Sequence, residues 1–299
     1  MTEPMTIETA ELRKSYGSAE ALRGLNLKVP AGSIYGFPGK DGAGKTTTIK
    51  ILLGMSKPTT GRASVFGLDA GGCETSVAIR GRTGFVSEDK DLIDSMTVEE
   101  MIRFTAAFYP HWRRDLQERY LRKFELPEAR QVEDLSRGMR TKPALLLALS
   151  RGAELLILDE PTSGLDPAAI EEVLQAIVAH VANEGNTVFF SSHQITEVDQ
   201  IADHVTILDR GQAVVAGAIE DLRDRYRRVQ VVFDGDAPKP VLHSPGIVGM
   251  RTERRTLTVF VSAGAERIVD EVRALNPVSV DVIPVTLKEI FLETVAKEN

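Results

Sequence analysis

The stretch GKDGAGKT at 39–46 holds residue types that bind phosphate. Its spacing, G-x-x-x-x-G-K-[ST], is typical of a loop whose backbone N–H groups surround phosphate oxygens, and it stands between a predicted strand and a predicted helix. Lys45 is expected to reach the β and γ phosphates and to act in catalysis, and the Thr46 hydroxyl to hold Mg²⁺. A plain glycine-rich turn before a helix is the alternative. The pattern predicts nucleotide contacts from Gly39, Lys40, Asp41, Gly42, Ala43, Gly44, Lys45, Thr46 and Thr47.

Two adjacent carboxylates, Asp159 and Glu160, follow the aliphatic run LLIL at 155–158. A carboxylate at the end of a buried strand is costly unless a cation or a hydrogen-bond donor meets it, so Asp159 is a candidate Mg²⁺ partner. Glu160 is a candidate general base that orients and deprotonates a water for attack on the γ-phosphate. The pair gains this meaning from the phosphate loop upstream.

Strands that alternate with amphipathic helices are predicted over the first two thirds of the chain. This order favours βαβ units and a mostly parallel sheet, which is an α/β fold. With the phosphate loop at 39–46 it is typical of a P-loop NTPase. The strands are expected at 25–29, 33–37, 155–159 and 187–191, and the helices at 46–55, from Thr97, at 113–126, 167–182 and 194–202.

The pattern changes near residue 219. A charged helix is predicted at 220–228, strands at 229–233 and 256–261, and further helices at 265–275 and 286–296. We therefore expect a nucleotide-binding domain over 1–218, with a β-rich N-terminal part and a helical subdomain at about 89–150. A small α+β accessory domain is expected over 219–299, and the sequence does not indicate its role.

Composition excludes several classes of protein. The 299 residues carry a formal charge of −7, which gives no electrostatic reason to bind nucleic acid, and the single cysteine excludes a disulfide framework or a four-cysteine zinc site. The apolar runs are too short for a transmembrane helix, and the first residues hold no signal-peptide core. These features favour a cytoplasmic chain.

Further motifs extend the pattern in a fixed order: LSRGM at 135–139, LLILDEP at 155–161, SGLDP at 163–167 and SSHQ at 191–194. Together with the phosphate loop they resemble the nucleotide-binding subunits of ATP-binding-cassette (ABC) transporters over residues 6–217. Within that family the chain is most similar to subunits of ABC-2 export systems, with supporting cues in TGFVSED at 83–89, FYPHW at 108–112 and TLKEIFLETV at 286–295.

The resemblance implies roles for four more residues. Tyr16 corresponds to the ring that stacks on adenine, and Glu88 stands where a glutamine usually touches Mg²⁺ and reports nucleotide state to the membrane subunit. His193 corresponds to a catalytic histidine that contacts the γ-phosphate, and Asp166 to a loop that contacts the other subunit of a dimer. A surface tyrosine, a solvated glutamate and a structural histidine are the alternatives.

The segment at 135–139 implies a dimer. In this family it binds the γ-phosphate held by the other subunit, which assigns this contact to Ser136, Arg137, Gly138 and Met139; a simple helix cap is the alternative. The expected partners are a second nucleotide-binding subunit, in a homodimer or a heterodimer, and a separate integral membrane subunit. The chain would then be cytoplasmic and peripheral on the inner face of the cell membrane, with ATP and Mg²⁺ as ligands and no nucleic acid.

Some residues depart from the family pattern. Arg137 and Met139 replace glycine and glutamine, and Asp41 replaces an asparagine, where a carboxylate about 6 Å from a phosphate costs roughly 3 kcal/mol at an effective dielectric near 20 unless it points outward. Pro143 should kink or shorten the helix predicted at 136–149.

Two alternatives to an exporter ATPase stay open. Asp41 and Arg137 suggest a regulatory subunit that binds ATP without hydrolysis. The other alternative is a soluble ABC ATPase that acts on ribosomes or DNA. A surface that contacts the membrane subunit is expected after Glu88. The alternative for most of its candidate residues is that they belong to the core of the helical subdomain. The candidates are Met96, Met101, Phe108, His111 and Trp112.

Overall fold

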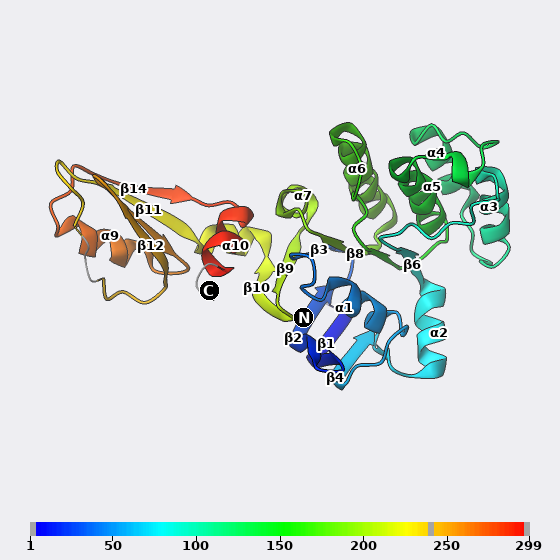
Figure 1. Cartoon of the computed structure of the whole chain (residues 1–299), viewed down its shortest axis with the longest axis horizontal. Helices are drawn as coiled ribbons and strands as arrows, with labels where there is room; N and C mark the ends of the chain where they lie inside the picture. The colour runs from blue at the N-terminus through cyan, green and yellow to red at the C-terminus, as the bar shows by residue number, and fades with distance from the viewer. Residues whose placement is uncertain (1–3, 239–241, 296–299) are drawn as a thin grey trace. The chain divides into compact units, whose positions relative to one another are not determined.

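Two compact units, Met1–Ala213 and Val214–Asn299, divide the chain in the computed structural model (Figure 1), which describes residues 4–238 and 242–295. The first unit contains two sheets. The smaller is antiparallel in the order β2-β1-β4-β5. Its strands are β1 (Met5–Tyr16), β2 (Ala19–Pro30), β4 (Thr60–Val65) and β5 (Leu68–Asp69).

The larger sheet of the first unit contains parallel strands in the order β9-β3-β8-β7-β6. They are β9 (His204–Asp209), β3 (Ile34–Pro38), β8 (Thr187–Ser192), β7 (Leu155–Leu158) and β6 (Thr83–Val86). Every residue of β3, β7 and β8 is buried, which is why these strands are uniformly apolar or small and do not alternate. Because the strands are parallel, the loops after β3, β6, β7 and β8 all leave the same edge of the sheet.

Helices complete the first unit. Figure 1 shows α3, α4 and α5 as one group, the helical region predicted at about 89–150. The helices are α1 (Lys45–Leu52), α2 (Cys73–Arg82), α3 (Val98–Ala106), α4 (Arg114–Lys123), the short 3₁₀ turn Val132–Asp134, α5 (Arg137–Leu149), α6 (Pro167–Glu184) and α7 (Ile195–Ile201). β10 (Gln212–Ala218) spans the boundary between the two units.

The predicted shortening of the helix around Pro143 is wrong. Helix α5 runs without interruption from Arg137 to Leu149, with Pro143 inside it. A proline removes one backbone donor, but Leu145, Leu146 and Leu149 are almost completely buried. We attribute the continuity to this packing, since helices in proteins draw most of their stability from tertiary contacts.

The second unit is a four-stranded antiparallel sheet in the order β12-β13-β11-β14, with α9 on one face. Val229, Val259 and Leu257 of the sheet pack with Ile268 and Val272 of α9 in a small core of its own. The α+β prediction is confirmed. The elements are α8 (Ile219–Arg225), β11 (Arg227–Val232), β12 (Ile247–Glu253), β13 (Thr256–Val261), α9 (Ala265–Arg273), β14 (Ser279–Pro284) and α10 (Leu287–Val295); residue 296 of the predicted last helix lies outside the described residues.

Candidate nucleotide-binding and hydrolysis site

The loop between β3 and α1 has the backbone geometry that a phosphate cradle requires. Gly44 has φ +107°, and a Cβ there would stand 2.7 Å from the carbonyl oxygen of Ala21, so only glycine fits. Gly42 also has positive φ, at +78°, with open space where a Cβ would lie. Helix α1 begins at Lys45 without a side-chain cap and without an acidic residue in its first turn. Its first N–H groups and its positive dipole end are therefore available to an anion.

A hollow lies over this loop. Besides the loop, Ala21 of β2 and the two carboxylates Glu88 and Glu160 line it. Thr46 and Glu88, two of the predicted Mg²⁺ ligands, thus face the same space. The loop residues that line it are Lys40, Asp41, Gly42, Ala43, Gly44, Lys45, Thr46 and Thr47.

Lys45 and Asp41 behave in opposite ways. The Lys45 side chain is only 7% exposed, and its ammonium donates to the carbonyl of Gly39 at 2.7 Å. The Asp41 side chain is 99% exposed, and its carboxylate stays 4.0 Å from the Lys45 nitrogen. The outward direction considered in the sequence analysis is the one observed, so water screens the Asp41 charge.

Glu160 lies at the centre of a hydrogen-bonded network. It is 4% exposed; its Oε1 is 3.1 Å from Nζ of Lys45, and its Oε2 is 2.7 Å from Nδ1 of His193. The backbone N–H of His193 also donates to Oε2, at 3.2 Å. Glu160 has φ +48°, a left-handed conformation that is uncommon for a residue other than glycine. Such strain is often found where a side chain must be held in one direction for chemistry.

Asp159 and Glu160 are joined through Ser191. The Ser191 hydroxyl donates to Oδ1 of Asp159 at 2.6 Å and accepts from the backbone N–H of Glu160 at 2.9 Å. Asp159 is 2% exposed and is not among the residues that line the hollow. Ser191 was not predicted as a site residue, although it stands in the SSHQ motif, because the family resemblance implies a role only for His193 of that motif.

The oxygen atoms near the phosphate loop suit a Mg²⁺ ion that is also bound by phosphate and water. Within residues 4–238 and 242–295, no three His, Cys, Asp or Glu side chains gather as a metal cluster. Mg²⁺ in nucleotide sites is usually held by one or two protein oxygens together with phosphate oxygens and water. A hydroxyl from Thr46 and a carboxylate from Glu88 beside the phosphate loop are consistent with such a site, and Asp159 stands behind it.

Three other predicted positions lie apart from the hollow. Tyr16 ends β1 and is 52% exposed, with Nζ of Lys14 4.8 Å above its ring. Ser136 caps α5 by accepting from the N–H of Met139 at 3.2 Å, and Asp166 caps α6 by accepting from Ala169 at 3.0 Å. These contacts lie within a few residues in sequence, and they do not test the roles in adenine stacking and dimer contact that were predicted for the three residues.

The first turn of α5 lies beside the loop before α6. A Cβ on Gly138 would stand 3.2 Å from Cδ2 of Leu165 and 3.3 Å from the carbonyl oxygen of Gly164. The LSRGM and SGLDP motifs are therefore neighbours within one chain. The side chain of Arg137 lies outside the part of the structure that is described, although its backbone begins α5.

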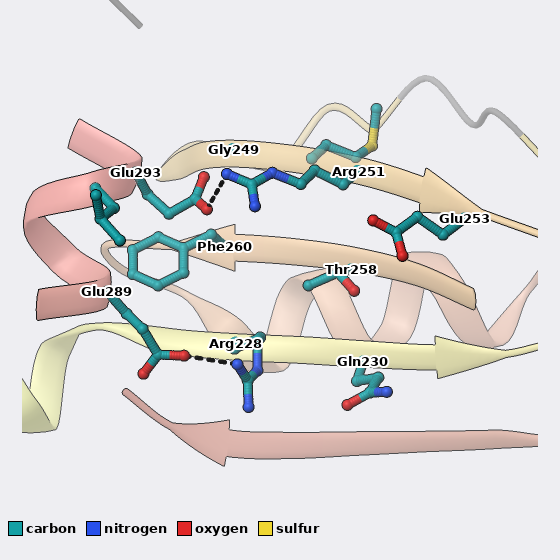
Figure 2. Close-up of a pocket in the computed structure, with 11 residues that line it drawn as sticks. Arg228, Gln230, Gly249, Arg251, Glu253, Thr258, Phe260, Glu289 and Glu293 are labelled. Carbon is teal, nitrogen blue, oxygen red and sulfur yellow. Dashed lines mark hydrogen bonds and ion pairs between the residues drawn. The ribbon is translucent and has the colours of Figure 1, made fainter. Parts of the chain in front are cut away.

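A second hollow lies in the C-terminal unit, on a face of its sheet beside α10 (Figure 2). Arg228 is 2.6 Å from Glu289 of α10, and Arg251 is 2.5 Å from Glu293 of α10. Glu253 adds a third carboxylate to the lining. Because both guanidinium groups are paired and carboxylates outnumber them, this hollow offers no net positive charge to a nucleotide.

Comparisons with known proteins agree with the site. The ABC transporter family model matches residues 22–163. The chain is 32% identical over 303 residues to the bacitracin transport ATP-binding protein BcrA of Bacillus licheniformis, covering 96% of this chain and 94% of that protein. It is 30% identical over 310 residues to the daunorubicin resistance ATP-binding protein DrrA3 of Streptomyces coeruleorubidus, covering 96% and 94%.

A solved ATP-binding subunit of an ABC transporter is 28% identical, with a TM-score of 0.66 over 73% of this chain and 92% of that one. A dimeric bacterial ABC cassette at 23% identity and a TM-score of 0.65 covers 71% of this chain and 98% of its own, and shares the fold. Among the described helices, none combines the length and the apolar character that a membrane span needs. From its motifs, its site and these relatives, the chain belongs to the ATP-binding subunits of ABC transporters, ATP hydrolases that resemble those of the ABC-2 export type.

Proposed function

We propose that this chain is the ATP-hydrolysing subunit of a membrane exporter and works by ATP-driven dimerisation. One observation carries the proposal: a buried glutamate, Glu160, is held between the lysine of the phosphate loop and a histidine after the neighbouring strand. A general base needs this kind of fixed orientation.

The residues divide the work as follows. The N–H groups of the loop and of the first turn of α1 bind the phosphates, and Lys45 neutralises negative charge on the γ-phosphate. A phosphate at Lys45 competes with Glu160 for the ammonium, so ATP binding weakens the Lys45–Glu160 ion pair. Glu160 is then available to take a proton from the attacking water, and His193 keeps its carboxylate in place.

Magnesium is part of this proposal. When bound beside the β and γ phosphates, Mg²⁺ would neutralise charge that develops on the phosphoryl oxygens. Thr46, Glu88 and Asp159 are the residues proposed to hold it, with Asp159 fixed by Ser191 at 2.6 Å. For the adenine ring of ATP, we propose that Tyr16 stacks on it, since the exposure of the tyrosine leaves one face of its ring open to a ligand.

Dimerisation completes each site. Ser136, Arg137, Gly138 and Met139 of one subunit are proposed to contact the γ-phosphate on the phosphate loop of the other. The start of α5 suits this task because backbone N–H groups at a helix N-terminus bind anions. Gly138 packs beside Gly164 and Leu165, which supports the proposal that the loop that carries Asp166 takes part in the same contact.

The helical region is the proposed contact with the membrane subunit. Of the predicted surface residues, Met101 is buried, whereas Phe108 is 65% exposed and meets the 45% exposed Phe104 edge to face at 5.2 Å. His111 is exposed and Met96 and Trp112 are half-buried. Exposed aromatic pairs of this kind favour a protein partner. Such a partner would hold the chain at the inner face of the membrane.

Phosphate release by purified protein, together with its co-purified membrane subunit, tests the proposal. We expect Mg²⁺-dependent hydrolysis that falls by about 10²-fold or more in Glu160→Gln. Equal rates for the two proteins, with ATP binding intact, would favour a regulatory subunit that does not hydrolyse ATP. Recovery of ribosomal subunits in place of a membrane protein would favour the soluble class.

A further inference from the structure

A buried lysine, Lys90, lies in the loop after β6, two residues beyond Glu88. It is only 4% exposed. Its ammonium donates to three backbone carbonyls: Ser87 at 3.1 Å, Glu88 at 3.0 Å and Glu160 at 2.9 Å. The Lys90 ammonium thus connects the loop that contains Glu88, the proposed Mg²⁺ ligand, to the backbone of Glu160, the proposed general base.

The geometry at Lys90 is specific. An ammonium group has three hydrogens, and a buried one must satisfy them to offset the loss of water. Three carbonyl oxygens from two segments about 70 residues apart in sequence supply the acceptors. Replacing Lys90 with an apolar side chain of similar length would leave these carbonyls without that donor while keeping the packing volume.

Both connected segments contain strained backbone. Lys90 has φ +53° and Glu160 has φ +48°, and residues other than glycine adopt such angles only when their surroundings hold them. The carbonyl of Glu160 accepts from the N–H of Ser163 at 3.2 Å as well as from Lys90. Its backbone is therefore fixed from two sides, and one of the two is the Glu88 loop.

We propose that Lys90 is a positioning residue that couples the Glu88 loop to the direction of the Glu160 carboxylate. A displacement of the loop moves two of the three acceptors, and the shared ammonium passes the displacement to the backbone of Glu160. Lys90 contacts no reacting atom in this scheme. The inference rests on the proposed function, because hydrolysis by Glu160 is what the coupling controls.

Steady-state kinetics of Lys90→Met provide the first test. A misdirected base lowers turnover without removing phosphate contacts, so we expect kcat to fall by about 10- to 100-fold while KM for ATP changes by less than about threefold. Lys57→Met, which changes an exposed lysine of the same unit, is the matched control and should keep the wild-type kcat. An unchanged kcat in folded Lys90→Met would overturn the proposal, and so would equal losses in ATP affinity and turnover.

A double-mutant cycle separates coupling from general damage. If Lys90 acts through the Glu160 carboxylate, adding Lys90→Met to Glu160→Gln should lower the residual kcat by much less than Lys90→Met lowers kcat in the wild-type background. Fully multiplicative effects would mean that the two residues act independently, and the coupling would be wrong.

Hydrogen exchange gives a readout that does not depend on turnover. In Lys90→Met, amides of residues 87–94 and 160–163 should exchange faster, while α3 and α9 keep their protection. If Lys90→Met does not fold, Lys90→Gln, which retains an amide donor, takes its place in the same measurements. Unchanged exchange in both segments overturns the inference, whereas wild-type protein with no turnover above Glu160→Gln overturns only the proposed function.

Discussion

Lys45 and Asp41 lie in the same short loop, yet they differ in burial and therefore in the strength of their electrostatic interactions. Lys45 is almost fully buried and contacts backbone carbonyls and Glu160, whereas Asp41 extends into solvent. A charge in water is screened by the high dielectric, so the acidic replacement at position 41 has a small cost. We conclude that Asp41 does not by itself argue against ATP binding.

Asp41→Asn tests this conclusion. At about 6 Å and a dielectric near that of water, removing one carboxylate gains only about 0.7 kcal/mol, so ATP affinity should rise by about threefold or less. Isothermal titration with a slowly hydrolysed ATP analogue measures it, with Glu8→Gln as a control that removes an exposed charge from β1. Tightening by more than about tenfold would place the Asp41 carboxylate against the phosphates.

The sequence predicted the chemical groups of the site better than the residues that support them. Lys45, Glu160 and His193 were predicted from motifs, and the structure brings them together around one carboxylate. Lys90 was missed because its partners are backbone carbonyls, which carry no sequence signal. The direction of Asp41 could not be predicted either, since it depends on how the loop turns.

Helices and strands were predicted from the sequence where local signals and packing agree. The helix expected from Thr97 exists, because Thr97 accepts from the N–H of Glu100 while the Glu100 side chain accepts from the N–H of Thr97. Strands β12 and β14 were not predicted; both consist of exposed and partly buried residues and contain no fully buried one. Their place depends on pairing with β13 and β11, which only the fold supplies.

Thr97→Ala should destabilise the first unit by about 1 kcal/mol, because the cap hydrogen bond to Glu100 is lost. Urea unfolding monitored by circular dichroism measures the change, and Thr97→Ser, which retains the hydroxyl, should recover most of it. A Thr97→Ala midpoint equal to that of the wild type would mean that the capping box contributes nothing in this fold.

Packing of α6 on α4 predicts a pH dependence. His180 of α6 is 1% exposed; its Nδ1 lies 3.2 Å from the hydroxyl of Tyr120, and its Nε2 lies 3.1 Å from the amide nitrogen of Asn186. That nitrogen also donates to the carbonyl of Ala153 at 2.7 Å, so Nε2 acts as an acceptor and the ring is neutral. Burial lowers the pKa of His180 to about 4.

The direction in which stability changes with pH follows from proton binding at His180. Between pH 6.5 and about 4 the unfolded chain binds a proton at His180 that the folded chain does not, so the free energy of unfolding falls as the pH falls through this window. The loss amounts to about 3 kcal/mol by pH 4. Relative to wild type, His180→Gln should flatten the pH dependence of urea unfolding, whereas His111→Gln, at an exposed site, should not. Parallel curves for wild type and His180→Gln would contradict the assignment.

The whole chain carries a formal charge of −7 and still binds a polyanion. The attraction must come from fixed local groups, namely the buried ammonium of Lys45 and the uncapped start of α1. The same reasoning applies to the dimer. Two acidic subunits repel each other at long range, and in the proposed dimer a bound nucleotide contacted from both sides offsets this repulsion.

Glu160→Gln should therefore collect as an ATP-bound dimer, because ATP binds but is not consumed. Light scattering should show the mass of two chains with Mg²⁺ and ATP and of one chain without ATP. Adding Lys45→Ala to Glu160→Gln is the matched control and should restore the monomer, since the γ-phosphate then lacks its buried cation. Ser136→Arg in the same background should also give monomers, because it blocks the approach of α5 to the phosphate of the other subunit. A monomer under every condition, even with the membrane subunit present, would mean that ATP does not join two copies of this chain.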